Sequence, residues 1–285
     1  MDLKNYINEL EHIPTISNIA LKVLQLLSNP EVNINEVTHI VEQDQALTGN
    51  ILKVANSGYF EFMDEIKTIK KAIVLIGFKL TKEITSAFAV KSLFESLKES
   101  EKIDYMEIWK HALYSALFAQ KLAPHFNIDP DEIYISALLH DIGIVVQLNY
   151  APERFSSYLI NQKNEPTSYY MIEKEQNSEL THDEIGFMLL QKWNLPSAIA
   201  IPVRWHHRLN QLPKELVNYQ NPITCITLGN YFAHTYCNDI HNTSILLEDG
   251  YGYFIPEEMK PNIEDLFHQL KEEIEKEEEF LNLFY

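Results

Sequence analysis

Cysteine and glycine are scarce in this chain of 285 residues. The two cysteines, Cys225 and Cys237, stand twelve positions apart and form neither a CxxC metal motif nor a disulfide framework. We therefore expect them to be small core residues in a reducing compartment, the cytoplasm. Only 8 glycines are present, whereas long stretches are rich in Leu, Ile, Ala, Lys and Glu. This composition disfavours a turn-rich β fold and favours helices.

Long apolar runs and positive charge are also lacking. No run approaches the roughly 20 apolar residues that a membrane span needs, and the opening MDLKNYINELEH has no signal-peptide pattern. The chain carries 23 basic and 41 acidic residues, a formal net charge of −18. A field of this sign repels the phosphates of nucleic acids and anionic lipids. We expect neither nucleic acid nor a membrane as a partner.

The first hundred residues predict a succession of short helices. Apolar positions recur at three-to-four spacing from Ile16 to Leu27, with Thr15 or Ser17 as the expected N-cap. Gly77 is expected to separate two helices, an arrangement that a DNA-binding helix-turn-helix would share. The negative charge and the lack of an Arg-rich second helix favour plain helical packing instead. Further helix starts are expected at Asn33, Asp44, Thr68 and Thr81.

The rest of the chain is also helical in pattern, so the predicted fold class is all-α. A polar break, LKESEKID at residues 97–104, is the expected boundary between subdomains. No strand-like alternation persists anywhere. We predict an N-terminal helical subdomain over residues 1–98 and a helical core over 99–245. Residues 246–285 are predicted to form an aromatic turn and an acidic amphipathic helix that docks through Ile, Leu and Phe.

Five histidines and one aspartate stand on predicted apolar helices where a metal site could use them. Imidazole and carboxylate ligands together suit divalent Fe, Mn, Zn or Ni. A single buried histidine is usually a core residue with one hydrogen bond, but five on successive apolar helices favour a shared site, because a bundle collects ligands from facing helices. The candidate ligands are His111, His140, Asp141, His182, His206 and His207.

Several long segments resemble the HDOD (HD-related output domain) family, a divergent branch of the HD and HD-GYP superfamily. The early matches are IPTISNIALKVLQLL, VEQDQALTGNILKVANSGYF and IKKAIVLIG. The later matches are LLHDIG, THDEIGFMLLQKWNLP and HH. The resemblance covers roughly residues 10–235. It implies an HD-like helical core, a bacterial regulatory role that is usually non-catalytic, and Asn230 at the position of the last metal-binding aspartate.

Three departures from the catalytic HD-GYP pattern weigh against an enzyme. Ile144 stands where those enzymes carry a lysine that can meet phosphate, and Asn230 replaces an acidic ligand. The Gly-Tyr-Pro signature is absent from RLNQLPKEL after HH. The EDGYGYF stretch at residues 248–254 lies about forty positions too late to supply it.

We therefore expect a cytoplasmic bacterial signalling or regulatory module that acts through contacts with signalling proteins. We assign no catalytic residue. Whether the site binds a divalent metal is left open by the sequence. One alternative is a metal-dependent phosphohydrolase or phosphodiesterase that uses the same ligands. Another is a non-catalytic sensor of a nucleotide or a metal, which would bind its ligand without forming a product.

Overall fold

The computed structural model describes residues 16–27, 31–60, 65–97, 103–164, 168–176, 178, 180–238, 259–277 and 281–284. These residues form helices and turns, and no strand occurs among them. The all-α prediction is confirmed. Three features of the sequence analysis lie outside the described residues: Thr15, most of the polar break at 97–104, and the aromatic turn at 248–254.

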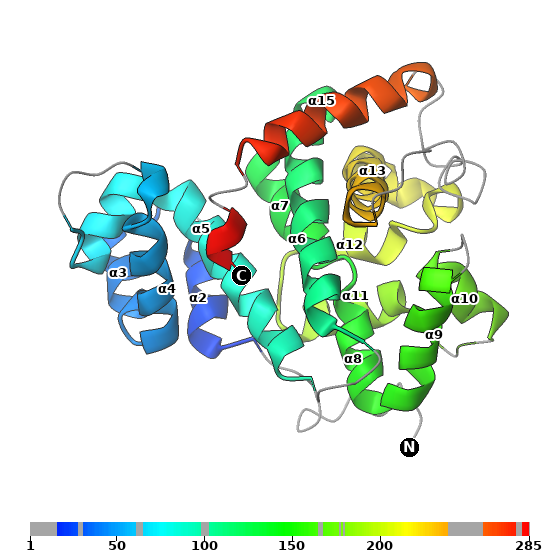
Figure 1. The fold of residues 1–285 in the computed structure, drawn as a ribbon, viewed down its shortest axis with the longest axis horizontal. Helices are drawn as coiled ribbons and strands as arrows, with labels where there is room; N and C mark the ends of the chain where they lie inside the picture. Colours follow the sequence, from blue (N-terminus) through cyan, green and yellow to red (C-terminus); the bar gives the residue numbers. More distant parts are fainter. Residues whose placement is uncertain are drawn as a thin grey trace. The chain divides into compact units, whose positions relative to one another are not determined.

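The chain divides into two compact units. One consists of Thr15–Leu93 with Glu272–Tyr285, and the other of Met1–Pro14 with Phe94–Lys271. Among its described residues, the segment Thr15–Leu93 of the first unit contains four α-helices and a short 3-10 turn, and the segment Glu272–Tyr285 adds the end of α15 (Ile263–Glu275) and the 3-10 turn η8 (Asn282–Phe284). Those of Thr15–Leu93 are α2 (Asn18–Leu27), α3 (Ile34–Val41), α4 (Gln45–Ala55), η2 (Gly58–Phe60) and α5 (Ile69–Glu95), which runs into the second unit (Figure 1).

Local capping sets the starts of these helices. The Asn33 side chain accepts a hydrogen bond from the backbone N–H of Asn35, and the Asp44 side chain accepts one from that of Leu47. Ser17 and Thr68 accept similar bonds from the first turns of α2 and α5. These four predicted helix starts are confirmed.

Gly77 breaks α5 into two helices. Its φ of 82° and ψ of 166° lie in a region that side chains with a Cβ rarely adopt. The prediction that Thr81 begins the second helix was wrong. The backbone is already helical directly after Gly77, and the Thr81 hydroxyl donates to the Gly77 carbonyl oxygen at 2.7 Å.

The second unit is a larger bundle (Figure 1). Helix α13 packs against α6, α6 against α7, and α11 against both α8 and α12. Its helices are α6 (Tyr105–Leu122), α7 (Pro130–Leu138), α8 (Ile142–Tyr150), α9 (Pro152–Asn164), α10 (Tyr169–Glu175), α11 (His182–Lys192), α12 (Ser197–Trp205) and α13 (Gln220–Cys237). Short 3-10 turns are η3 (Ala123–Phe126), η4 (Leu209–Gln211), η5 (Lys214–Tyr219) and η7 (Lys260–Asn262), and α15 (Ile263–Glu275) follows them.

Two glycines let helices of this bundle approach at backbone distance. A Cβ added at Gly229 of α13 would lie 2.7 Å from the Ser115 carbonyl oxygen of α6. A Cβ added at Gly143 of α8 would lie 2.0 Å from the His182 carbonyl oxygen at the start of α11. Such separations are shorter than any van der Waals contact. Only glycine therefore permits these two crossings.

The apolar segment Pro130–Tyr150, which contains α7 and α8, is long and apolar enough by length and composition to cross a membrane. Within the bundle, 83% of its window is buried. A core helix pair has the same composition as a membrane span, so this burial accounts for its apolar character.

The acidic C-terminal helix α15 is amphipathic, as predicted. Its Phe267 ring lies 5.9 Å from the Phe118 ring and 5.3 Å from the Phe232 ring, measured between centroids. Glu264 and Asp265 are exposed on the opposite side. Helix α15 therefore docks through its apolar residues while its acidic residues face solvent. The two cysteines are both free.

Candidate metal centre

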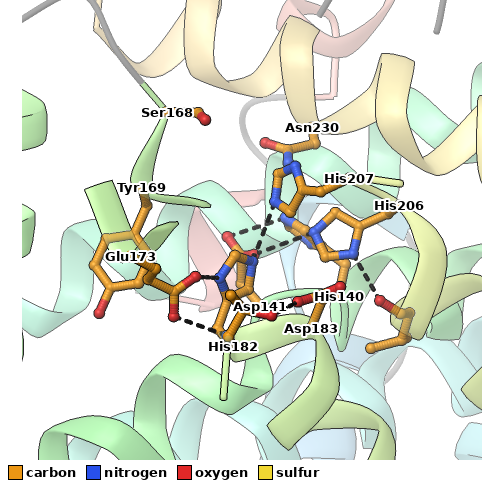
Figure 2. A network of polar contacts seen from close by, with 12 residues as sticks. His140, Asp141, Ser168, Tyr169, Glu173, His182, Asp183, His206, His207 and Asn230 are labelled. Carbon is orange, nitrogen blue, oxygen red and sulfur yellow. Dashed lines mark hydrogen bonds and ion pairs between the residues drawn. The ribbon is translucent and has the colours of Figure 1, made fainter. Parts of the chain in front are cut away.

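The seven predicted ligands come together in the second unit although 119 positions separate the first from the last. His111 lies in the second turn of α6, and Asn230 lies in the middle of α13. The other ligands come from helix ends, and Figure 2 shows them converging. They are His140 and Asp141 between α7 and α8, His182 at the start of α11, and His206 and His207 after α12.

Asp141 is the centre of the cluster. One carboxylate oxygen, Oδ2, lies 3.0 Å from His140 Nε2 and 3.7 Å from His111 Nε2. The other, Oδ1, lies 3.1 Å from His182 Nε2 and 3.7 Å from His206 Nε2. Each oxygen thus faces its own pair of imidazoles.

The ligand atoms form two groups that share Asp141. One contains Asp141, His182, His206 and His207, and the other contains His111, His140 and Asp141. Within each group the ligand atoms all lie within 4.8 Å of one another. Nitrogen and oxygen ligands about 2.1 Å from one ion are separated by about 3.0–3.4 Å at ordinary coordination angles. The observed spacing fits a cation in either group after small side-chain rotations.

Two buried imidazole nitrogens in the cluster, Nε2 of His140 and Nε2 of His206, have the Asp141 carboxylate as their neighbour, at 3.0 Å and 3.7 Å, and make no hydrogen bond to any other group. In both residues the other nitrogen, Nδ1, lies 2.6–2.7 Å from a backbone carbonyl oxygen, of Ala137 and of Val203 respectively. A carbonyl only accepts, so Nδ1 carries a proton, and in the neutral form of either ring Nε2 keeps a lone pair. These lone pairs face the Asp141 carboxylate, which also only accepts. A cation between them satisfies all three groups.

Burial and charge set the protonation of the cluster. Burial lowers the pKa of His111 to about 3, and it also lowers the pKa of His206 and His207. Burial acts against the charged form of Asp141 as well, yet the adjacent histidines, His140 foremost, hold its pKa well below the usual value. At His111, His206 and His207 the cluster therefore offers neutral imidazoles, and at Asp141 a carboxylate, which are the protonation states that bind metals.

Glu173 of α10 contacts the cluster through His182 and was not predicted from the sequence. Its Oε2 accepts a hydrogen bond from His182 Nδ1 at 2.7 Å, and its Oε1 accepts from the His182 backbone N–H at 2.8 Å. Oε1 also accepts from Gln147 Nε2 at 2.5 Å, and Gln147 in turn accepts from the Tyr169 hydroxyl. Burial disfavours the charged imidazole, but Glu173 outweighs it and raises the pKa of His182 well above the usual value.

The hydrogen bond to Glu173 fixes the orientation of the His182 ring. With its Nδ1 proton directed at Glu173, His182 presents Nε2 to Asp141 and to His207, whose Nε2 lies 3.1 Å away. The His207 ring stacks on Tyr170, also from α10, at 4.8 Å and 19°. Helix α10 thereby contacts two of the candidate ligands.

Asn230 and His234 flank the His111 side of the cluster. Asn230 Oδ1 lies 3.1 Å from His111 Nε2. The His234 ring, one turn later on α13, lies 6.3 Å from the His111 ring. Asn230 was predicted from the sequence and His234 was not, although their spacing of four on one helix places both on the same face.

Arg208 directly follows the histidine pair in the sequence, and its side chain forms ion pairs with two carboxylates. Its guanidinium lies 2.7 Å from Asp183 Oδ2 and 3.1 Å from Glu184 Oε1. Glu184 and Thr181 also form a capping box at the start of α11. This pairing ties the start of α11 to the end of α12. Ile144, at the position of the HD-GYP lysine, is buried and uncharged.

The HDOD domain profile matches residues 13–209 of the chain. Two curated bacterial proteins, both uncharacterized, are similar in sequence. One from Treponema pallidum (strain Nichols) is 25% identical over 225 residues, which is 78% of this chain and 42% of that protein. YuxH from Bacillus subtilis (strain 168) is 28% identical over 201 residues, which is 66% of this chain and 47% of that protein. The match thus spans less than half the length of either relative.

Solved structures with the same fold cover almost the whole chain. A proposed phosphohydrolase from Shewanella amazonensis SB2B has a TM-score of 0.73 at 19% identity, covering 99% of this chain and 98% of that one. An HDOD domain protein of unknown function from Geobacter sulfurreducens has a TM-score of 0.68 at 21% identity, covering 95% and 96%. A proposed signal transduction protein from Marinobacter aquaeolei VT8 reaches 0.71 at 17% identity, covering 100% and 61%.

The profile match covers more than half of the chain and includes the His-Asp pair and both later histidine positions. The helical bundle and the clustered histidines agree with that match. This chain belongs to the HDOD domain family.

Proposed function

We propose that this HDOD protein is a cytoplasmic signalling or regulatory module that holds a divalent metal at Asp141 and acts through contacts with signalling proteins, without catalysis. The observation that supports it best is the pair of buried Nε2 atoms, of His140 and His206, that face only the Asp141 carboxylate. A buried carboxylate costs several kcal/mol unless a cation or several hydrogen-bond donors meet it.

The donor set suits Fe, Mn, Zn or Ni. His182, His206, His207 and Asp141 would hold one ion, and His111, His140 and Asp141 offer a second position beside Asn230. A bound ion would supply a positive charge that links α6, α8, α11 and the end of α12. Metal binding would then raise the free energy of unfolding of the bundle, by about 4 kcal/mol when the free metal concentration is 1,000 times its Kd. A partner protein would distinguish the metal-bound from the metal-free form by this difference in stability.

Metal content is the direct test. We expect about one or two divalent ions per chain in untagged protein purified without chelator, and their loss in His140→Ala and Asp141→Ala, because each change removes a ligand from the cluster. His125→Ala is the matched control, since His125 is exposed outside the cluster. Elemental analysis by mass spectrometry measures the content. Metal at background level in the wild type would contradict the proposal, as would equal content in all four proteins.

A metal-dependent phosphohydrolase is the second candidate, because two ligand groups that share a carboxylate resemble the arrangement of two-metal hydrolases. That chemistry also needs a cationic clamp for the phosphate. Ile144 offers none, and Arg208 is held by Asp183 and Glu184. The lost acidic ligand at Asn230 weakens this candidate further.

We therefore expect no release of product from a general phosphoester or a cyclic dinucleotide by the metal-loaded protein beyond that of the metal ion alone. Turnover that depends on added metal and disappears in His140→Ala would favour the enzyme instead. Saturable nucleotide binding that raises Tm without product would favour a nucleotide sensor. Chromatographic analysis of the reaction and thermal melts with the same nucleotides distinguish these cases.

A further inference from the structure

His207 is held differently from three other histidines of the candidate metal centre. In His140, His182 and His206, Nδ1 lies 2.6–2.7 Å from an acceptor oxygen, which fixes the orientation of the ring. Among the described residues, His207 has no such acceptor, and its hydrogen-bond neighbour is His182 Nε2, at 3.1 Å. That nitrogen is itself a candidate ligand atom. Hydrogen bonding to a group outside the ligand set therefore does not orient the His207 ring.

Tyr170 of α10 makes the contact that orients it. The Tyr170 ring lies 4.8 Å from the His207 ring, measured between centroids, and the two planes are 19° apart. The rings of His206 and His182 also lie close to His207, at 4.0 Å and 5.0 Å, but they are tilted against it by 46° and 79°. Of these three rings, that of Tyr170 is stacked on His207. Rotation of the imidazole about χ2 would press its edge into the tyrosine ring, so the stack keeps the imidazole in one plane.

Helix α10 presents Tyr170 and Glu173 to neighbouring ligands. The two residues are three positions apart, so they lie side by side on the helix surface. Glu173 contacts His182, whereas Tyr170 contacts His207. The Nε2 atoms of the two histidines are 3.1 Å apart (Figure 2), a separation that suits two ligands of one ion. The short helix thus orients two ligands of the same group, one through a hydrogen bond and the other through stacking.

His207 determines whether this ligand group is complete. Four residues offer one ligand atom each to a single ion, namely Asp141, His182, His206 and His207. Four protein ligands are typical of a closed structural site for a tetrahedral ion such as Zn²⁺. Without His207 three ligands remain, which is the number typical of catalytic sites that keep one position open. A closed group agrees with a module that does not catalyse.

Given the metal centre proposed above, we propose that Tyr170 is the positioning residue of His207 and that it keeps the four-ligand group closed. When the Tyr170 ring leaves its place, the His207 imidazole gains rotational freedom and withdraws from the ion. The Tyr170 ring is half-buried, and the next residue, Met171, is 43% exposed. The contact that closes the group therefore lies at the protein surface.

The test measures the affinity of full-length proteins for Co²⁺ by competition with a chelator of known Kd. Tyr170→Leu keeps an apolar side chain that cannot stack, and we expect it to bind Co²⁺ about tenfold more weakly than the wild type. The visible absorption spectrum of its bound Co²⁺ is expected to change as well, because a ligand is lost. Tyr170→Phe keeps the ring and is expected to restore the wild-type affinity and spectrum. Met171→Ala, on the exposed side of the same helix, is the matched control and is expected to bind as the wild type does.

A double-mutant cycle separates positioning of His207 from a general effect on α10. In a His207→Ala protein, Tyr170→Leu is expected to cause no further loss of affinity, because the ring that Tyr170 orients is absent. An equal loss in both backgrounds would overturn the proposal, as would wild-type affinity and spectrum in Tyr170→Leu. Tyr170→Met, a second apolar replacement that cannot stack, is measured in the same way, with helix content checked by circular dichroism, so that the result does not depend on the folding of one variant. Absence of Co²⁺ binding by the wild type would instead refute the metal centre itself, and the role of Tyr170 with it.

Discussion

Replacing Gly143 with alanine is expected to destabilise the protein by about 3 kcal/mol or more and to displace His182 from the metal cluster. The new Cβ would lie 2.0 Å from the His182 carbonyl oxygen, 2.8 Å from its carbonyl carbon and 2.9 Å from the Gly186 nitrogen. All three are backbone atoms, so no side-chain rotation relieves the clash. Helix α11 must move away from α8, and overpacking of this kind costs at the upper end of the usual range.

Urea denaturation together with metal analysis measures both effects. The matched control is Gly49→Ala in α4, where an added Cβ meets nothing within 4 Å. Gly49 is exposed inside a helix, so alanine there is expected to stabilise by about 0.5–1 kcal/mol. A Gly143→Ala protein with wild-type stability would mean that α8 and α11 do not cross at backbone contact.

Replacing Glu173 with glutamine is expected to weaken metal binding about 10- to 100-fold, the usual effect of losing the hydrogen-bond partner of a ligating histidine. This prediction rests on the proposed metal centre. Glu173 accepts three hydrogen bonds through two oxygens. A glutamine has one oxygen and an NH₂ group, which would face a donor on His182. The ring would lose the partner that directs Nε2 toward Asp141.

Metal affinity is measured by competition with a chelator of known Kd, for Glu173→Gln and for Glu175→Gln. Glu175 lies on the same short helix and is exposed, so its change removes the same charge without touching His182. We expect Glu175→Gln to bind metal as the wild type does. If both variants keep wild-type affinity while Glu173→Gln alone lowers Tm, Glu173 is a structural residue only.

Local signals explain why most of the fold could be predicted from the sequence. Helix starts such as Asn33 and Asp44 depend on a side chain and the backbone N–H two or three residues later. Thr81 was the exception, because a glycine with positive φ ends one helix and begins the next without a cap. Capping rules alone do not anticipate that geometry.

Residues of the candidate site could be predicted from the sequence where their type alone is unusual for a helix. They could not be predicted where their role depends on contact with a residue of another helix. The His-Asp pair and the later histidines are visible as unusual residues on apolar helices. Glu173 lies in YYMIEKE among other charged residues, and only its spacing from Tyr169 and Ile172 indicates that it faces inward. That its partner is His182, nine positions away, depends on how α10 packs beside α11.

Asp141 occupies the N-cap position of α8, yet its side chain makes no capping hydrogen bond. A side chain at that position ordinarily stabilises its helix by about 1 kcal/mol. Here the carboxylate points to the histidines instead, so α8 lacks the N-cap hydrogen bond that would stabilise it locally. Selection for thermal stability alone, in medium stripped of divalent metal, would thus favour a serine or threonine at position 141. The most stable variants from such a screen would be those that have lost the Asp141 carboxylate. Stability and metal binding therefore place opposite demands on this one position.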